Sequence, residues 1–169
     1  MNYAKIKHFC ISNGPGIRTV LFCQGCPIHC SGCFNHDTWD FNGGKKFDHD
    51  AMVELVSSFG DVSGEHIAGL SILGGEPLSC EGGNKEQVTK ICKLVKSIYP
   101  NKTIWLWTGY EWEDILNYEV MNYIDVCVTG PFEITKRNLN LKYCGSTNQR
   151  VVDVKKTRNC GEIVLYEDL

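Results

Sequence analysis

The stretch RTVLFCQGCPIHCSGC, residues 18–33, joins a short apolar run to a loop with four cysteines in eleven residues. The run Arg18–Phe22 has the composition of a buried strand, since it is rich in β-branched and large apolar side chains. Four thiols can fill a zinc site, pair as disulfides, act as a redox pair or bind an iron–sulfur cluster. The chemistry of the loop that follows the strand therefore decides how the whole chain is interpreted.

The rest of the chain alternates predicted strands and helices. Apolar runs predict strands at Ile67–Leu73, Thr103–Trp107, Ile124–Val128, Arg150–Val154 and Glu162–Tyr166, and helical spacing predicts helices at His49–Ser58, Lys85–Ile98 and Glu111–Tyr118. This alternation predicts an α/β fold with parallel strands, whose functional loops lie at the strands' carboxyl ends. Four successive strands are followed there by CQGCPIHCSGC, GGEP, TGY and TGPF. Because the chain is short for an eight-unit barrel, we expect a partial, open (β/α) barrel and a single domain at residues 1–169.

Charge and hydropathy exclude several classes of protein. The net charge is −3 and no basic run occurs, which argues against a nucleic-acid partner. No apolar stretch approaches the roughly 20 residues of a membrane span, and the N-terminus lacks a signal-peptide core. We therefore expect a cytoplasmic protein with no membrane partner. In that compartment the ten cysteines are not a disulfide framework, and Cys92 and Cys127 have the surroundings of small buried hydrophobes.

The cysteine loop contains the spacing C-x3-C-x2-C at Cys26, Cys30 and Cys33. A compact loop of this kind can place three thiolates on three irons of a 4Fe-4S cluster and leave the fourth iron open to a ligand. A zinc site of four cysteines usually takes two pairs that are well separated in sequence, so four ligands from one loop would be crowded. Cys23 and Cys26 also form a C-x-x-C pair, which leaves a redox role open.

The flanking residues resemble those of a known family. The cysteine spacing, with NGPGIRTVLF at 13–22, GGEP at 74–77 and GSTNQR at 145–150, is similar to the radical S-adenosylmethionine (SAM) enzymes, and among these to the glycyl-radical-enzyme activating proteins. The likeness extends from about residue 10 to residue 154 and is greatest to the activating proteins of anaerobic ribonucleoside-triphosphate reductases. It implies a partial barrel of the radical SAM type.

The resemblance also implies an activity. Cys26, Cys30 and Cys33 would be the metal ligands and catalytic residues, holding a 4Fe-4S cluster that cleaves SAM reductively to a 5′-deoxyadenosyl radical. That radical would generate a glycyl radical on the large subunit of an anaerobic (class III) ribonucleoside-triphosphate reductase. A low-potential electron donor such as flavodoxin would reduce the cluster.

SAM-binding residues follow from the same resemblance. They would be Gly32, Cys33 and Phe34 near the adenine, and Gly74, Gly75 and Glu76 near the amino group. Glycines after a strand let the backbone approach a ligand closely, and a carboxylate can accept hydrogen bonds from an ammonium group. Cys23 lies outside the three-cysteine motif, and we expect a semi-buried thiol at a strand end.

Three alternatives remain at this point. The first is an activator of pyruvate formate-lyase or of another glycyl radical enzyme. The second, from a different class, is a non-catalytic interaction module with zinc bound by four cysteines, and the third is a thiol–disulfide oxidoreductase. The GGEP loop and the loops that recur after the strands favour the activase. The pattern assigns no role to Cys144, to Cys160 or to the region after Asp153.

Overall fold

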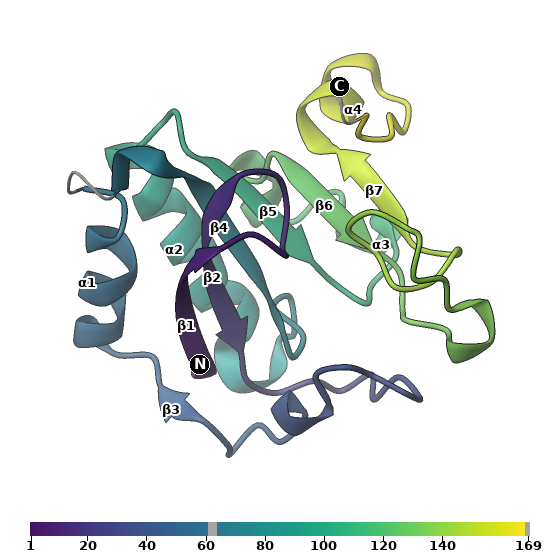
Figure 1. Cartoon of the computed structure of the whole chain (residues 1–169), viewed down its shortest axis with the longest axis horizontal. Coiled ribbons are helices and arrows are strands. Elements are labelled where there is room, and N and C mark those ends of the chain that lie inside the picture. Colours follow the sequence, from purple (N-terminus) through teal and green to yellow (C-terminus); the bar gives the residue numbers. More distant parts are fainter. Residues whose placement is uncertain (61–63, 168–169) are drawn as a thin grey trace.

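The computed structural model describes residues 1–60 and 64–167, and its centre is a seven-stranded open sheet (Figure 1). The strand order is β3-β1-β2-β4-β5-β6-β7. The strands are β1 (Asn2–Cys10), β2 (Ile17–Cys23), β3 (Lys45–Lys46), β4 (Ile67–Gly74), β5 (Thr103–Trp107), β6 (Val126–Thr129) and β7 (Arg150–Asp153). The α/β class that the sequence predicts is confirmed.

Helices connect these strands. The α-helices are α1 (His49–Ser57), α2 (Asn84–Ile98), α3 (Trp112–Ile115) and α4 (Val154–Cys160), and the short 3-10 turns are η1 (His36–Thr38), η2 (Gly64–His66), η3 (Glu81–Gly83), η4 (Glu119–Asn122) and η5 (Ile134–Lys136). Asp48 caps α1 by accepting a hydrogen bond from the amide of Ala51 at 3.1 Å. None of the helices in the described part of the chain is long and apolar enough to span a membrane.

The four central strands, β2, β4, β5 and β6, are parallel, as the sequence predicts, and antiparallel β1 and β7 flank them. Cys23 pairs with Gly74, so β2 and β4 end side by side. Because the four strands run in one direction, the loops that follow them meet at one edge of the sheet.

The two faces of the sheet differ in their covering. On one face, which we call the helix face, Leu21, Ile72 and Leu106 pack with α1 and α2 in a continuous apolar core. The residues that follow them, Phe22, Leu73 and Trp107, point to the opposite face because side chains alternate along a strand. Loops cover part of this second face, which we call the open face.

A buried arginine on the open face connects three strands by hydrogen bonds. The guanidinium of Arg18 donates hydrogen bonds to Ser71 Oγ at 2.7 Å, to the carbonyls of Leu70 and Thr103 at 2.8 and 2.9 Å, to Thr103 Oγ1 at 3.0 Å and to the carbonyl of Pro15 at 3.3 Å. Burial lowers the pKa of Arg18 to about 10, so the side chain stays charged at neutral pH. It thus joins β2, β4 and β5 to the loop that precedes β2.

The part of the chain after β5 differs most from the prediction. The helix predicted at Glu111–Tyr118 is only the single turn α3, and α4 appears in a region for which no helix was predicted. The predicted strand Glu162–Tyr166 is reduced to one bridge between Leu165 and Val152, flanked by backbone hydrogen bonds to β7. Asp153 explains part of this change, because its side chain accepts from the amide of Lys156 and starts α4 directly after β7.

Candidate functional site

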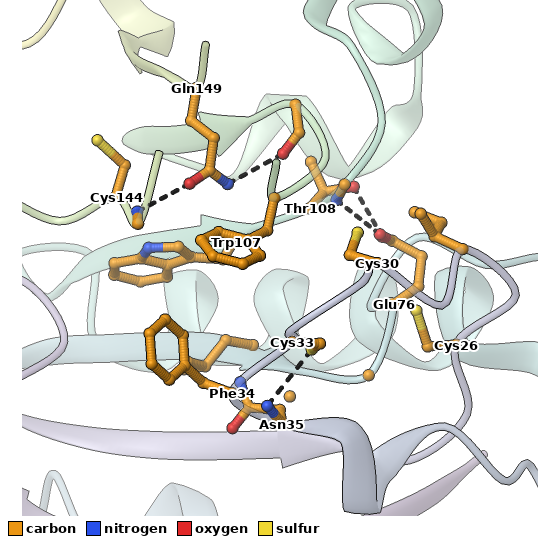
Figure 2. Close-up of a pocket in the computed structure, with 18 of the residues that line it drawn as sticks. Cys26, Cys30, Cys33, Phe34, Asn35, Glu76, Trp107, Thr108, Cys144 and Gln149 are labelled. Carbon is orange, nitrogen blue, oxygen red and sulfur yellow. Dashed lines mark hydrogen bonds between the residues drawn. The ribbon is translucent and has the colours of Figure 1, made fainter. Parts of the chain in front are cut away.

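A cavity of about 500 Å³ lies on the open face, at the carboxyl ends of the parallel strands. Cys26, Cys30 and Cys33 line it from the loop after β2, and Gly74–Glu76 line it from the end of β4 and the loop that follows. Figure 2 shows the cysteine loop with Glu76 beside Cys26 and Cys30, and Phe34 further along the loop. The predicted convergence of the loops at this edge is therefore observed.

Backbone hydrogen bonds hold the cysteine loop in place. The amides of Gly25 and Cys26 donate to the carbonyls of Thr38 and Trp39 at 2.8 and 3.0 Å, so the outgoing and returning arms of the loop are paired. Gly25 has φ +91°, and a Cβ there would lie 2.1 Å from the ring of Phe41. Only glycine fits that position, because both the backbone conformation and the space exclude a side chain.

The three loop thiols are partly buried in the cavity wall. Burial raises the pKa of Cys26 and of Cys30, and backbone amides counter this rise only in part. Metal ligation needs the thiolate, so these cysteines would ionise when a cation such as iron is present to balance their charge. The Sγ atom of Cys33 also accepts a hydrogen bond from the amide of Asn35 at 3.4 Å. Three soft donors from one loop fit an iron–sulfur cluster.

Cys23 belongs to the other face of the sheet. It is the last residue of β2, is fully buried, and packs in the core of the helix face. Burial raises the pKa of its thiol. The predicted position at a strand end is confirmed, and the prediction of a semi-buried thiol is wrong, because the thiol is fully buried. In the described part of the chain, no three His, Cys, Asp or Glu side chains are grouped closely enough to hold a single metal ion together. A 4Fe-4S cluster differs from a single ion because it binds each of three thiolates at a different iron.

The Gly74–Glu76 loop packs directly on the cysteine loop. The amide of Gly75 donates to the carbonyl of Cys23 at 2.9 Å, and the amide of Glu76 donates to the carbonyl of Gly25 at 2.8 Å. A Cβ at Gly75 would lie 2.3 Å from the Gly25 oxygen, so a larger residue would push the two loops apart. The small size of Gly75 therefore allows the two loops to pack closely, in addition to letting the backbone approach a ligand.

The carboxyl group of Glu76 is buried and links the ends of β4 and β5. Its Oε1 accepts from Thr108 Oγ1 at 2.7 Å and from the Leu78 amide at 2.9 Å, and its Oε2 accepts from the Gly109 amide at 2.8 Å. Burial raises the pKa of Glu76 to about 7, although these three donors favour the ionised form. Oε2 has one donor among them, so it keeps acceptor capacity for a further group.

Phe34 and Gly32 lie at the outer side of the cysteine loop. Phe34 lines the cavity, is 64% exposed, and lies 5.6 Å from the ring of Phe132 and 5.2 Å from the guanidinium of Arg137. Gly32, with φ +75°, faces Ile134 and is not among the residues that line the cavity. Of the predicted site residues, all except Gly32 therefore contribute to the cavity wall.

The opposite wall comes from the long connection between β6 and β7, whose middle part, residues 133–144, the sequence did not mark. The residues that line the cavity from this region are Gly130, Phe132, Leu141, Tyr143, Cys144, Gly145 and Gln149. Gln149 holds this wall by accepting from the Gly145 amide at 2.8 Å and donating to the Gly130 carbonyl at 3.0 Å (Figure 2). The sequence pointed to the two ends of this region, through TGPF at 129–132 and GSTNQR at 145–150. Neither stretch predicts how the residues between them fold into the wall.

Comparison with known proteins identifies the family. The model of a 4Fe-4S single cluster domain matches residues 12–152. The anaerobic ribonucleoside-triphosphate reductase-activating protein of Enterobacteria phage T4 is 41% identical over 153 residues, which cover 89% of this chain and 93% of that protein. The chain belongs to the family of anaerobic ribonucleoside-triphosphate reductase-activating proteins.

Two cellular members of this family are similarly close. The protein of the same name from Vibrio cholerae is 34% identical, covering 88% of this chain and 96% of that protein. The one from Escherichia coli K12 is 33% identical, covering 89% and 97%. Every residue that lines the cavity, from Ser12 to Gln149, falls inside the range matched by the 4Fe-4S domain model. The cavity therefore belongs to the part of the chain that its family shares.

Proposed function

We propose that this protein is a radical SAM activase that generates a glycyl radical on an anaerobic (class III) ribonucleoside-triphosphate reductase. One observation carries the proposal: the three cysteines of the C-x3-C-x2-C motif and the Gly74–Glu76 loop line the same cavity. Membership of a family whose named members activate that reductase gives the target. The whole chain, residues 1–169, would act as one domain, with the open sheet as a partial radical SAM barrel.

In this proposal Cys26, Cys30 and Cys33 hold a 4Fe-4S cluster. When bound, the cluster supplies the electron that splits the carbon–sulfur bond of SAM into methionine and a 5′-deoxyadenosyl radical. The loop contributes three thiolates, and the burial of Cys23 in the helix-face core keeps its thiol away from the set. One iron is thereby left for SAM itself.

SAM would lie between the two motif loops. The free acceptor capacity of Glu76 Oε2 suits the amino group of SAM, beside the backbone of Gly74 and Gly75. Phe34, with the backbone of Gly32 and Cys33, would contact the adenine. Phe34 offers an exposed aromatic surface for this, since 64% of the residue is accessible.

The protein substrate would be the large subunit of the reductase. A glycine on a large folded protein can reach the reacting atoms only where the activase is open, and the cavity lies on the open face of the sheet. The electron would come from a low-potential donor such as flavodoxin. Activation of pyruvate formate-lyase is the second candidate, and the family relationship favours the reductase.

The test is an anaerobic assay with reconstituted protein. The protein is loaded with iron and sulfide, reduced, and mixed with SAM and either the reductase or pyruvate formate-lyase. We expect a brown protein, release of 5′-deoxyadenosine, and a glycyl radical signal with the reductase. A radical on pyruvate formate-lyase alone would change the target, and a colourless protein with stoichiometric zinc would overturn the activity.

A pair of cysteine variants controls the assay. Cys30→Ser removes a proposed cluster ligand in the cavity wall, whereas Cys160→Ser changes an exposed cysteine at the end of α4. The first should abolish 5′-deoxyadenosine release and the radical signal, and the second should leave both unchanged. Equal activity of the two variants would contradict the assignment of Cys30.

A further inference from the structure

An asparagine outside both motifs connects the two loops of the site. Asn84 is the first residue of α2 and is fully buried. Its Nδ2 donates to the carbonyls of Gln24 and Glu76 at 3.0 Å each, and lies 3.5 Å from the carbonyl of Gly25. One amide group thus reaches the start of the cysteine loop and the Gly74–Glu76 loop together.

The position of Asn84 on its helix makes this contact unusual. Asparagine at the start of a helix commonly caps the helix with its side-chain oxygen. Here the cap position is Gly83, with φ +70°, and α2 has no side-chain cap. The Asn84 side chain is directed instead to carbonyls that lie 8, 59 and 60 residues away in the chain.

The orientation of the amide follows from its neighbours. A flipped amide would place its oxygen against three carbonyl oxygens, so the nitrogen must face them. The Oδ1 atom is buried and has no hydrogen-bond partner among the described residues. Leaving a buried acceptor unpaired costs free energy. The hydrogen bonds that Nδ2 donates therefore account for the presence and orientation of this side chain, and Oδ1 does not.

We propose that Asn84 is a positioning residue that holds the cysteine loop and the Gly74–Glu76 loop in register. This inference rests on the proposed function, because the register matters when one ligand, SAM, must meet the cluster and Glu76 together. Backbone bonds from Gly75 to Cys23 and from Glu76 to Gly25 join the same loops. The hydrogen bonds of Asn84 connect both loops to α2 as well, and α2 is packed in the helix-face core.

The first measurement concerns the loops themselves. Hydrogen exchange is followed by mass spectrometry on the full-length chain for wild type, Asn84→Ala, Asn84→Asp and the control Asn101→Ala, which changes an exposed asparagine between α2 and β5. We expect the amides of Gly25 and Glu76 to exchange about tenfold faster in both Asn84 variants and at the wild-type rate in the control. Wild-type exchange at these amides in the Asn84 variants would overturn the proposal. If the aspartate variant does not fold, the alanine variant decides.

The second measurement concerns the cofactor. The reconstituted variants should bind iron like wild type, because the three cysteines are unchanged. The SAM concentration that half-maximally perturbs the electron paramagnetic resonance spectrum of the reduced cluster should rise about tenfold, since small displacements of positioning groups have large effects. Faster loop exchange with unchanged SAM titration would overturn the positioning role. Failure of the wild type to respond to SAM would refute the proposed function instead, and the exchange result would still decide whether Asn84 holds the loops.

Discussion

The two faces of the sheet are built from the same strands but have different roles: one face packs the core and the other lines the cavity. On β5, Leu106 is fully buried in the core of the helix face, while the next residue, Trp107, lines the cavity of the open face. On β2 and its loop, Cys23 packs in that core, and Cys26 lines the cavity. The comparison shows how one sheet can separate stability from chemistry: apolar packing is concentrated on one side, and the reactive groups lie on the other.

The largest expected effect is the difference in iron binding between serine variants of Cys26 and Cys23, which lie three positions apart. Cys26→Ser should reduce iron binding and SAM cleavage to background, because the cluster loses a ligand. Cys23→Ser should retain the wild-type iron content, because its side chain lies in the helix-face core. Iron and sulfide analysis with 5′-deoxyadenosine release measures both. Loss of the cluster in folded Cys23→Ser protein would mean that four thiols act together.

The next effect tests the helix face. Leu106→Ala should lower the free energy of unfolding by about 2–5 kcal/mol, because it leaves a cavity in a fully buried core. Anaerobic denaturant titration measures this change. Leu139→Ala, at a residue that is 76% exposed, should change stability by no more than about 0.5 kcal/mol. A similar loss in both variants would contradict the assignment of the core to this face.

A buried carboxylate at the edge of the core gives a smaller and pH-dependent effect. Burial raises the pKa of Asp125, but hydrogen bonds from Lys155, Lys96 and the amide of Ile104 outweigh it, so the pKa lies below its ordinary 3.8. The ionised form therefore stabilises the fold above that pH, and this stability is lost as the pH falls below 3.8.

Asp125→Asn should accordingly lower the unfolding free energy at pH 7 by about 1.5–3 kcal/mol, since charged hydrogen bonds are lost. The difference from wild type should shrink as the pH falls below 3.8. Denaturant titrations across that pH range test the sign. Asp114→Asn, at an exposed residue of α3, is the control and should show no such difference. A constant difference at every pH would contradict this linkage.

The smallest effect belongs to the rim of the open face. Phe34→Ala should leave stability within about 0.5 kcal/mol, because the residue is 64% exposed. It should raise the KM for SAM about three- to tenfold through loss of an aromatic contact. Phe9→Ala, at a residue of β1 that is 61% exposed, should leave this KM unchanged. Equal KM values for wild type and Phe34→Ala would remove Phe34 from the proposed adenine contact.

The central strands and the position of the site could be predicted from the sequence. The runs at Ile67–Leu73 and Thr103–Trp107 are strongly apolar because most of their side chains are buried, and each is followed by residues that line the cavity. Strand β1 was not predicted, because exposed lysines alternate with partly buried residues in an antiparallel strand near the edge of the sheet.

The support of the site could not be predicted in the same way. Asn84 has the appearance of an ordinary helix-start residue in sequence, and its contacts lie up to 60 residues away. The far wall at 130–149 has no helical or strand periodicity over most of its length, so its place in the cavity depends on tertiary contacts such as that of Trp107 Nε1 with the Tyr143 carbonyl, at 2.7 Å. The cysteine spacing predicted the reactive groups from the sequence. The residues that position these groups are recognised only from tertiary contacts in the folded chain.

The two edges of the sheet have a consequence for self-association. Strand β3 pairs with β1 only at Asn2 and Tyr3, and both of its residues are lysines, Lys45 and Lys46. Over the rest of its length β1 forms this edge and carries the exposed lysines Lys5 and Lys7. At the other edge, the segment around Leu165 and Tyr166 pairs with β7, so part of its backbone is already hydrogen-bonded. Short, charged or covered edges discourage the addition of a strand from another molecule. A concentrated sample should therefore resist edge-to-edge aggregation, even though the open face between these edges leaves apolar side chains accessible.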